Sequence, residues 1–235
     1  LKLKYSMPKV IGEKDLVDSK DLSTQDEMNQ RMQINGILNI LRIFKEGFFY
    51  PVTDVIISNS LFNAGMNIHN YQITPIYGKK YHLIDSEFND LKKLWENYKE
   101  SILQSKSLQI AIRRFSQAIE RNNFEDKIID LFICAEALFV GEKGEVTYKL
   151  SQRMALFIID DKEKQKEVFQ FMKKAYSLRS DIVHGNKKQK FPKKKDGTSY
   201  NFYECSMQLE FFLRMALKKM IESRNNVDWD SILFK

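Results

Sequence analysis

The stretch YSLRSDIVHGN, residues 176–186, contains two side chains suited to chemistry on phosphate esters, Arg179 and His184. An arginine is permanently charged, and its planar guanidinium forks onto phosphate oxygens. A histidine has an unperturbed pKa of about 6.5, so near neutral pH it can accept or donate a proton. The spacing alone is weak evidence, because nine arginines and three histidines produce it by chance roughly one time in ten.

Both residues also have structural explanations. Five residues correspond to about 140° of rotation on an ideal α-helix, so Arg179 and His184 converge only where the last turn unwinds. A histidine at a helix C-terminus interacts favourably with the helix dipole. Arg179 can equally form an ion pair with a carboxylate such as Glu136. The surrounding sequence has to separate the catalytic explanation from the structural one.

Composition excludes several classes of function. No run of about 18 apolar residues is present, so we expect no membrane-spanning helix, and LKLKYSMPKV lacks the apolar core of a signal peptide. Cys134 and Cys205 stand apart, and no cluster has the spacing of metal ligands. We therefore expect no metal, no cofactor and a reducing, cytoplasmic setting. His69 and His82 match no motif and are expected to be surface or packing residues.

The apolar periodicity predicts an all-α domain behind an N-terminal extension. Residues 1–84 are expected to be this extension, or the end of a preceding regulatory region, with one helix from residue 34 and extended segments at 52–58 and 68–83. Residues 85–235 are expected to form a bundle of five or six helices with short links. The expected helices cover about 85–102, 108–119, 124–140, 145–159, 162–184 and 200–222. Gly185 is expected to end the fifth of them.

Three segments in sequence order resemble the HEPN superfamily, and most closely its Apea-like branch. They are LFICAEALFV (131–140), YKLSQRMALFI (148–158) and FMKKAYSLRSDIVHG (171–185). The resemblance covers about residues 88–222 and implies a HEPN-type helical bundle whose R-x(4 to 6)-H motif maps onto Arg179 and His184. It also implies a metal-independent endoribonuclease that acts as a homodimer, because in such enzymes two protomers each bring one motif to a shared cleft.

Five further residues are expected to support the site. Tyr176, Glu136 and Arg153 match motif positions, as does Lys149, and Ser180 and Asp181 directly follow Arg179. Many active family members have Asn, His or Asp directly after the arginine, whereas this chain has Ser180, which is common in the Apea-like branch. Either Ser180 or Asp181, four and three residues before His184, is expected to orient it. Glu136 and Arg153 lie on neighbouring expected helices, where such a pair is usually a structural ion pair.

The chemistry explains why two protomers would be needed. Cleavage of RNA through its own 2′-hydroxyl requires a base for that proton and an acid for the leaving 5′-oxygen. One His184 does not easily serve both roles, whereas a two-fold dimer supplies two histidines. Arg179 would stabilise the charge that builds on the pentavalent phosphorus, and the products would be a 2′,3′-cyclic phosphate and a 5′-hydroxyl.

The biological role follows only from the resemblance, which suggests a toxin or an antiviral defence nuclease. The alternative is a non-catalytic HEPN module that dimerises or binds RNA or a partner protein. In that case Arg179 and His184 would serve the interface.

The positive charge of the chain is concentrated in one loop. The net charge is +7, yet residues 1–100 contain 13 basic and 13 acidic residues. The segment KKQKFPKKK supplies six lysines: Lys187, Lys188, Lys190, Lys193, Lys194 and Lys195. The loop either forms a solvated connection or binds RNA phosphates beside His184 without reading sequence. No aromatic series stands beside it in the sequence, which argues against a dedicated single-strand platform.

Overall fold

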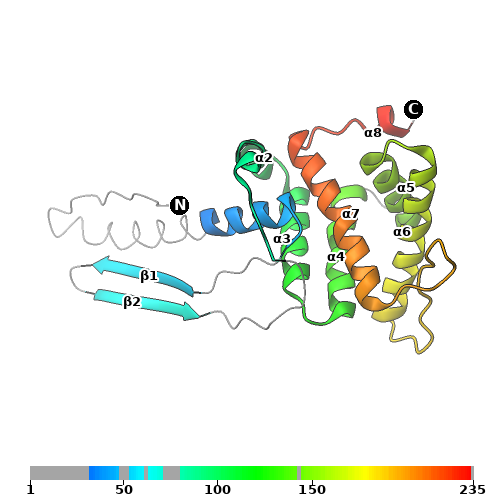
Figure 1. Cartoon of the computed structure of the whole chain (residues 1–235), viewed down its shortest axis with the longest axis horizontal. Coiled ribbons are helices and arrows are strands. Elements are labelled where there is room, and N and C mark those ends of the chain that lie inside the picture. The colour runs from blue at the N-terminus through cyan, green and yellow to red at the C-terminus, as the bar shows by residue number, and fades with distance from the viewer. Residues whose placement is uncertain (1–31, 48–52, 61–62, 71–79, 142–143, 234–235) are drawn as a thin grey trace. The chain divides into compact units, whose positions relative to one another are not determined.

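The computed structural model describes residues 32–47, 53–60, 63–70, 80–141 and 144–233 (Figure 1). The chain divides into two compact units, one formed by residues 1–38 and 50–75 and the other by residues 39–49 and 76–235. The second unit contains every motif that resembles the HEPN superfamily. The boundary expected between residues 84 and 85 stays a prediction, although residues 39–49 group with the helices that follow them.

The first unit contains an antiparallel β-hairpin. Strand β1, Thr53–Ser60, pairs with strand β2, Asn63–Asn70, and Ser60 lies opposite Asn63. The expected segment 52–58 overlaps β1, whereas 68–83 shares only its first three residues with β2. The sequence NAGMNIHN of β2 is poor in β-branched and aromatic residues, so composition placed the second strand too late in the chain.

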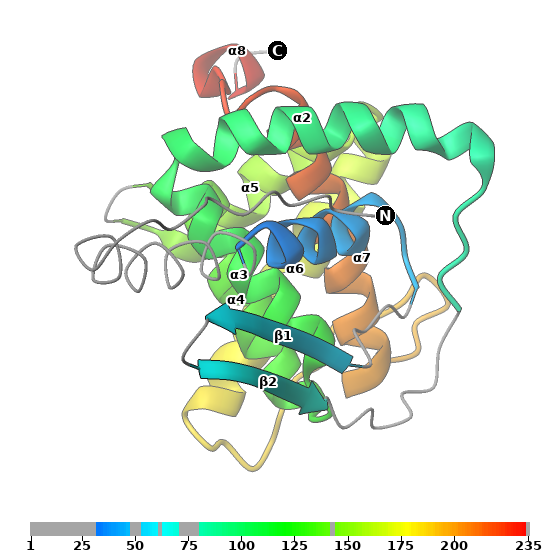
Figure 2. The ribbon, with the colours of Figure 1, turned by 90° about the vertical axis from the view of Figure 1, so that its left-hand side faces the viewer.

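The second unit is helical, and this confirms the all-α class. It begins with residues 39–44, the last part of a helix that starts at residue 32, and a short 3₁₀ turn, η1, and each of the six expected helices follows. The elements are η1 Asp85–Glu87, α2 Phe88–Gln104, α3 Lys106–Glu120, α4 Phe124–Phe139, α5 Val146–Ile158, α6 Lys162–Val183, α7 Phe202–Glu222 and α8 Trp229–Leu233. Helix α8 was not expected. In Figure 2, α2 crosses near one end of α3, α4 and α7.

The helix boundaries follow from local capping. Asn123 begins α4 by accepting hydrogen bonds from two backbone amides of the first turn, and Asp161 begins α6 in the same way with one. Asn201 and Glu204 form a reciprocal capping box at the start of α7. Ser105 separates α2 from α3, and its hydroxyl caps α3 by accepting a hydrogen bond from the amide of Leu108. Short polar residues therefore set the helix starts that the apolar pattern leaves imprecise.

Helix α4 is the centre of the bundle, as its nearly continuous apolar sequence predicts. It packs against α3, α5, α6 and α7. Its buried apolar side chains are Ile128, Leu131, Phe132, Cys134, Ala135 and Phe139. Burial raises the pKa of the Cys134 thiol far above its ordinary value, so this cysteine is an unreactive core residue.

A buried charge cluster joins α4 to α7. The Nζ atom of Lys127 lies 2.6 Å from Oε2 of Glu210, and the side chains are 9% and 7% exposed. Arg214 donates from Nη2 to the other oxygen of Glu210, and from Nε to the backbone oxygen of Arg42 at 2.9 Å. Burial alone would raise the pKa of Glu210, but Lys127 and Arg214 outweigh burial and hold it below its ordinary value.

We predict that Glu210→Gln lowers the free energy of unfolding by about 3–5 kcal/mol, because it leaves two buried cations without their anion. Urea denaturation followed by circular dichroism measures this loss. The matched control is Glu100→Gln, which removes an exposed ion pair with Arg224 at 3.2 Å and should cost less than about 1 kcal/mol. Equal losses in the two variants would contradict the structural role of the cluster.

The same substitution has a pH signature. The pKa of Glu210 is lower in the folded protein than in the unfolded chain. Its carboxylate therefore contributes fully to the free energy of unfolding above the unfolded pKa of about 4.3, and this contribution disappears as the pH falls through the folded pKa. The stability difference between the wild type and Glu210→Gln should therefore shrink on acidification below about pH 4.

Candidate active site

The C-terminus of α6 fixes the backbone of His184. His184 is the C-cap residue, with φ −89° and ψ 1°, and Gly185 follows with a φ of +66°, a conformation that glycine adopts without a steric penalty. The amide of Gly185 donates to the oxygen of Ile182 at 3.1 Å, and the amide of Asn186 donates to that of Asp181 at 2.9 Å. This is a Schellman motif, and Gly185 ends the helix as expected.

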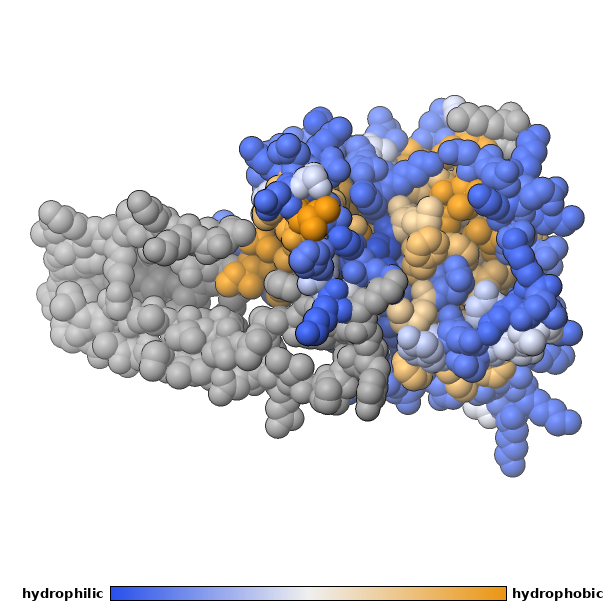
Figure 3. Space-filling view, viewed as in Figure 1, coloured by the Kyte–Doolittle hydropathy of each residue, from blue (hydrophilic) through white to orange (hydrophobic). Residues whose placement is uncertain are grey.

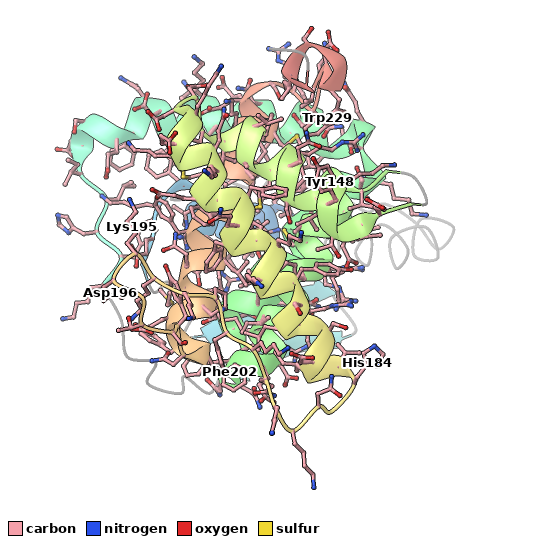
Figure 4. All side chains as sticks on the ribbon, turned by 90° about the vertical axis from the view of Figure 1, so that its right-hand side faces the viewer. Tyr148, His184, Lys195, Asp196, Phe202 and Trp229 are labelled. Atoms are coloured by element: carbon pink, nitrogen blue, oxygen red, sulfur yellow. The ribbon has the colours of Figure 1, made fainter. Side chains whose placement is uncertain are left out.

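The imidazole of His184 is exposed at this end of α6 (Figure 4). Within the part of the chain that the structure describes, it makes no hydrogen bond or ion pair. Helix α6 is regular through Val183, and His184 follows as its C-cap with a ψ of 1°, outside the helical range. On an ideal helix the two side chains would differ in direction by about 140°.

Arg179 faces α4 rather than His184. Its Nη2 atom lies 3.8 Å from Oε1 of Glu136, and the two side chains are 24% and 29% exposed. Its guanidinium carbon also lies 5.6 Å from the ring centroid of Tyr176, within cation–π range. The Nε atom is shielded from solvent and has no hydrogen-bond partner among the described residues. The guanidinium is therefore held in place by contacts that use none of its donors among the described residues. Its Nε is closed to a ligand, so only Nη1 and Nη2 remain for one.

Tyr176 links Glu136 to the core. Its hydroxyl donates a hydrogen bond of 2.9 Å to Oε1 of Glu136, and its ring packs edge-on against Phe132. Burial, followed by the hydrogen bond to Glu136, raises the pKa of Tyr176 above its ordinary value. Tyr176 therefore stays protonated and acts as a donor that fixes the carboxylate beside Arg179.

Asp181 organises the turn after His184. Its Oδ1 atom accepts a hydrogen bond from Nδ2 of Asn186 at 2.8 Å, and its Oδ2 atom accepts a longer one from the amide of Lys190 at 3.4 Å. The backbone oxygen of Ser180 accepts from the amide of His184 at 3.0 Å. Neither side chain bonds to the imidazole in the described structure. Their effect on His184 is through the backbone, which differs from the expected direct contact.

Arg153 does not pair with Glu136. Its Nη1 atom donates to the backbone oxygen of Phe139 at 2.9 Å, at the C-terminus of α4 where cations interact favourably with the helix dipole. Its guanidinium also stacks on Trp229 of α8, 5.2 Å from the ring centroid. Glu136 is instead occupied by residues of α6. The expected Glu136–Arg153 ion pair was therefore wrong, and Arg153 ties α4 to α5 and α8.

The lysine loop contains an ordered turn. The amide of Lys194 donates to the oxygen of Thr198 at 2.8 Å, and the amide of Tyr200 donates to that of Pro192 at 3.0 Å. At the base of this turn the rings of Phe191 and Phe202 pack edge-on. Residues 192–200 thus form a small hairpin that packs onto the start of α7.

The six lysines of the loop fall into two groups. Lys194 pairs with Glu204 at 2.6 Å and Lys195 with Glu167 at 2.8 Å. The other four lysines are exposed and form no ion pair with the described residues: Lys187, Lys188, Lys190 and Lys193. In Figure 4, Lys195 lies across the molecule from His184. The lysines that directly follow His184 in the chain, rather than the whole loop, are available to a ligand beside it.

The two remaining histidines are not joined to the site by any described contact. His69 lies in β2, and its side chain is outside the described residues. His82 is exposed, and its backbone oxygen accepts a hydrogen bond from Nζ of Lys45 at 2.9 Å. The structure thus gathers Glu136, Tyr176 and Arg179 in one cluster, with His184 at the helix end beyond it.

Two features had no place in the sequence-based site. Trp229 packs against Phe139 and Phe157, and Tyr203 and Phe211 of α7 are exposed although they are aromatic. The sequence signalled Tyr203 and Phe211 only by placing aromatic residues off the apolar stripe of their helix.

No cluster of three His, Cys, Asp or Glu side chains that could hold a metal is found among the described residues. None of the described helices has the length and apolarity to cross a bilayer.

Comparison of the chain with protein-family models, curated proteins and solved structures finds no match. Membership of the HEPN superfamily therefore stays a prediction from the three sequence segments.

We predict that Asp181→Ala loosens the turn after His184, because it removes the acceptor shared by Asn186 and Lys190. Hydrogen exchange measured by NMR should show the amide of Lys190 exchanging about fivefold faster or more. Asp160→Ala is the control, since Asp160 is exposed and precedes α6 instead of ending it. Unchanged protection of Lys190 would show that the carboxylate does not hold the turn.

Proposed function

We propose that this chain is a metal-independent endoribonuclease of HEPN type that acts as a homodimer. It cleaves RNA by attack of the 2′-hydroxyl on the adjacent phosphate. The observation that carries the proposal is the end of α6, where a partly exposed Arg179 and an exposed His184 lie about one and a half turns apart and neither side chain forms a hydrogen bond with the described residues. Arg179 would bind the scissile phosphate and stabilise its added negative charge.

The offset between the two side chains supports a site shared by two protomers. Arg179 is directed at Glu136 on α4, whereas His184 is exposed at the helix end. An exposed His184 is accessible to a second copy of the chain, whose own histidine would complete the acid–base pair. One imidazole takes the proton of the 2′-hydroxyl, the other protonates the leaving 5′-oxygen, and the products are a 2′,3′-cyclic phosphate and a 5′-hydroxyl.

Glu136 and Tyr176 are positioning residues in this proposal. A separation of 3.8 Å is too long for a hydrogen bond, so Glu136 attracts the guanidinium without occupying its donors. The Tyr176 hydroxyl holds the same carboxylate oxygen. Arg179 is thereby kept at the surface of α6 with donors left for a phosphate. A role in toxicity or antiviral defence is part of the proposal only through the sequence resemblance.

The proposal predicts RNA cleavage in the presence of EDTA, with cyclic-phosphate ends detected by mass spectrometry. Arg179→Ala and His184→Ala should each lower the rate by at least about 100-fold. Arg224→Ala and His82→Ala are matched controls, because both residues are exposed and outside the site. RNA that stays intact with a correctly folded, dimeric wild type would favour the alternative, a non-catalytic module that binds RNA or a partner.

Subunit mixing tests the shared site directly. If both histidines of a dimer are needed, an equal mixture of wild type and His184→Ala with free subunit exchange keeps about a quarter of the wild-type activity, since a quarter of the dimers carry two histidines. Independent sites would keep half. A protein that is monomeric at micromolar concentration and still cleaves RNA would also contradict the shared site.

The two groups of lysines give a further prediction. Replacing Lys187, Lys188, Lys190 and Lys193 with glutamine should reduce the slope of log K against log salt by up to about 3, at roughly 0.7 per lost phosphate contact with single-stranded RNA. The control replaces Lys194 and Lys195, whose charges are already paired, and should change the slope much less. Equal slopes for the wild type and the variant with four substitutions would show that the loop is only a solvated connection.

A further inference from the structure

An open groove runs along α7 beside the lysine hairpin. Its volume is about 370 Å³, and its walls come from the start and middle of α7, from the hairpin and from residue Glu46. Four lining residues carry the argument: Tyr203, Met207, Gln208 and Phe211. Figure 3 shows apolar surface on the face of the molecule that α7 crosses.

The groove presents two aromatic rings to solvent. Tyr203 is 46% exposed and Phe211 is 52% exposed. Each ring is supported by another ring, since Phe124 packs edge-on against Tyr203 at 5.4 Å and Phe212 lies 5.8 Å from Phe211. Rings that are held from one side and bare on the other are suited to stacking on flat ligands.

The spacing of these rings indicates a ligand with more than one flat group. Tyr203 and Phe211 are eight residues apart on one helix, which separates them by about 12 Å along its axis. Stacked rings lie within about 7 Å of each other, so the two side chains do not sandwich a single group. Met207 fills the row between them, and the amide of Gln208 has no hydrogen-bond partner among the described residues. An amide both donates and accepts, so it fits the edges of different bases.

The charges around the groove favour a polyanion. The charged lining residues are two cations, Lys194 and Arg214, and two carboxylates, Glu46 and Glu204, so the walls carry no net charge. The four unpaired lysines lie on the same loop, which runs from His184 to the start of α7 at Phe202 (Figure 4). The positively charged loop therefore connects the aromatic groove to the proposed cleavage site.

We infer that this groove binds two unstacked bases of single-stranded RNA, whose backbone continues over the lysines of the loop toward His184. The inference rests on the proposed ribonuclease function and specifies its substrate as single-stranded, because bases in a duplex are already stacked and cannot reach the rings. Binding is tolerant of sequence, since every base has a face that can stack. The two exposed rings of α7 thus supply the stacking surface beside the lysine loop.

The test uses a fluorescein-labelled 2′-O-methyl oligouridine, which the proposed chemistry cannot cleave, and measures binding by fluorescence anisotropy. Tyr203→Ala and Phe211→Ala should each weaken binding by about fivefold or more. Phe88→Ala is the matched control, because Phe88 on α2 is also 52% exposed and should leave binding unchanged. Tyr203→Phe retains a ring and should bind like the wild type. A self-complementary 2′-O-methyl duplex should bind more weakly than the single strand.

The possible results separate this inference from the proposed function. If the wild type cleaves RNA but both alanine variants bind the probe as tightly as it does, the groove is not an RNA site and the ribonuclease proposal stands. If binding depends on both rings and no RNA is cleaved, the groove is an RNA-binding site and the ribonuclease proposal fails. If the wild type does not bind the probe, the inference is overturned.

Discussion

The carboxylate of Glu210, buried between Lys127 and Arg214, constrains how the helices of the second unit assemble. It fixes α7 against α4, and Arg214 extends the constraint to the helix at residues 32–44 through the backbone oxygen of Arg42. A well-packed apolar cluster can be as stable as such a triad, so its specific contribution is to select one register of α7. With Glu210 turned inward, Tyr203 and Phe211 remain on the outward part of the helix.

The register of α7 also determines where the basic loop lies. Glu204 caps the first turn of α7 and at the same time binds Lys194 at 2.6 Å, so the hairpin at residues 192–200 is attached to the helix start. The other end of the loop is attached to α6 by Asp181 and the Schellman motif. Both ends of a strongly basic segment are therefore held, and between them Lys187, Lys188 and Lys190 form no ion pair with the described residues and would be available to a ligand.

Periodicity was sufficient to predict the six long helices, because each buries a stripe of apolar residues with regular spacing. It failed for α8, since five residues, Trp229–Leu233, are too few to show a period, and for β2, whose composition is not typical of a strand. For the site, the sequence offered both Arg179 and Arg153 as partners of Glu136, and the structure bears out only the first. The register of α4 against α6 brings Tyr176 and Arg179 to Glu136, whereas Arg153 binds the backbone at the end of α4.

The way Arg179 is held would let one residue serve both the structure and the proposed chemistry. A guanidinium in a close bidentate pair has already used the donors that a phosphate needs. Here the nearest carboxylate oxygen is 3.8 Å away and accepts its hydrogen bond from the Tyr176 hydroxyl, so the attraction is electrostatic and leaves the donors unused. The stacking on Tyr176 restricts the side chain without consuming a hydrogen bond. An arginine arranged in this way loses little side-chain freedom when an anion arrives, because its position was fixed before binding.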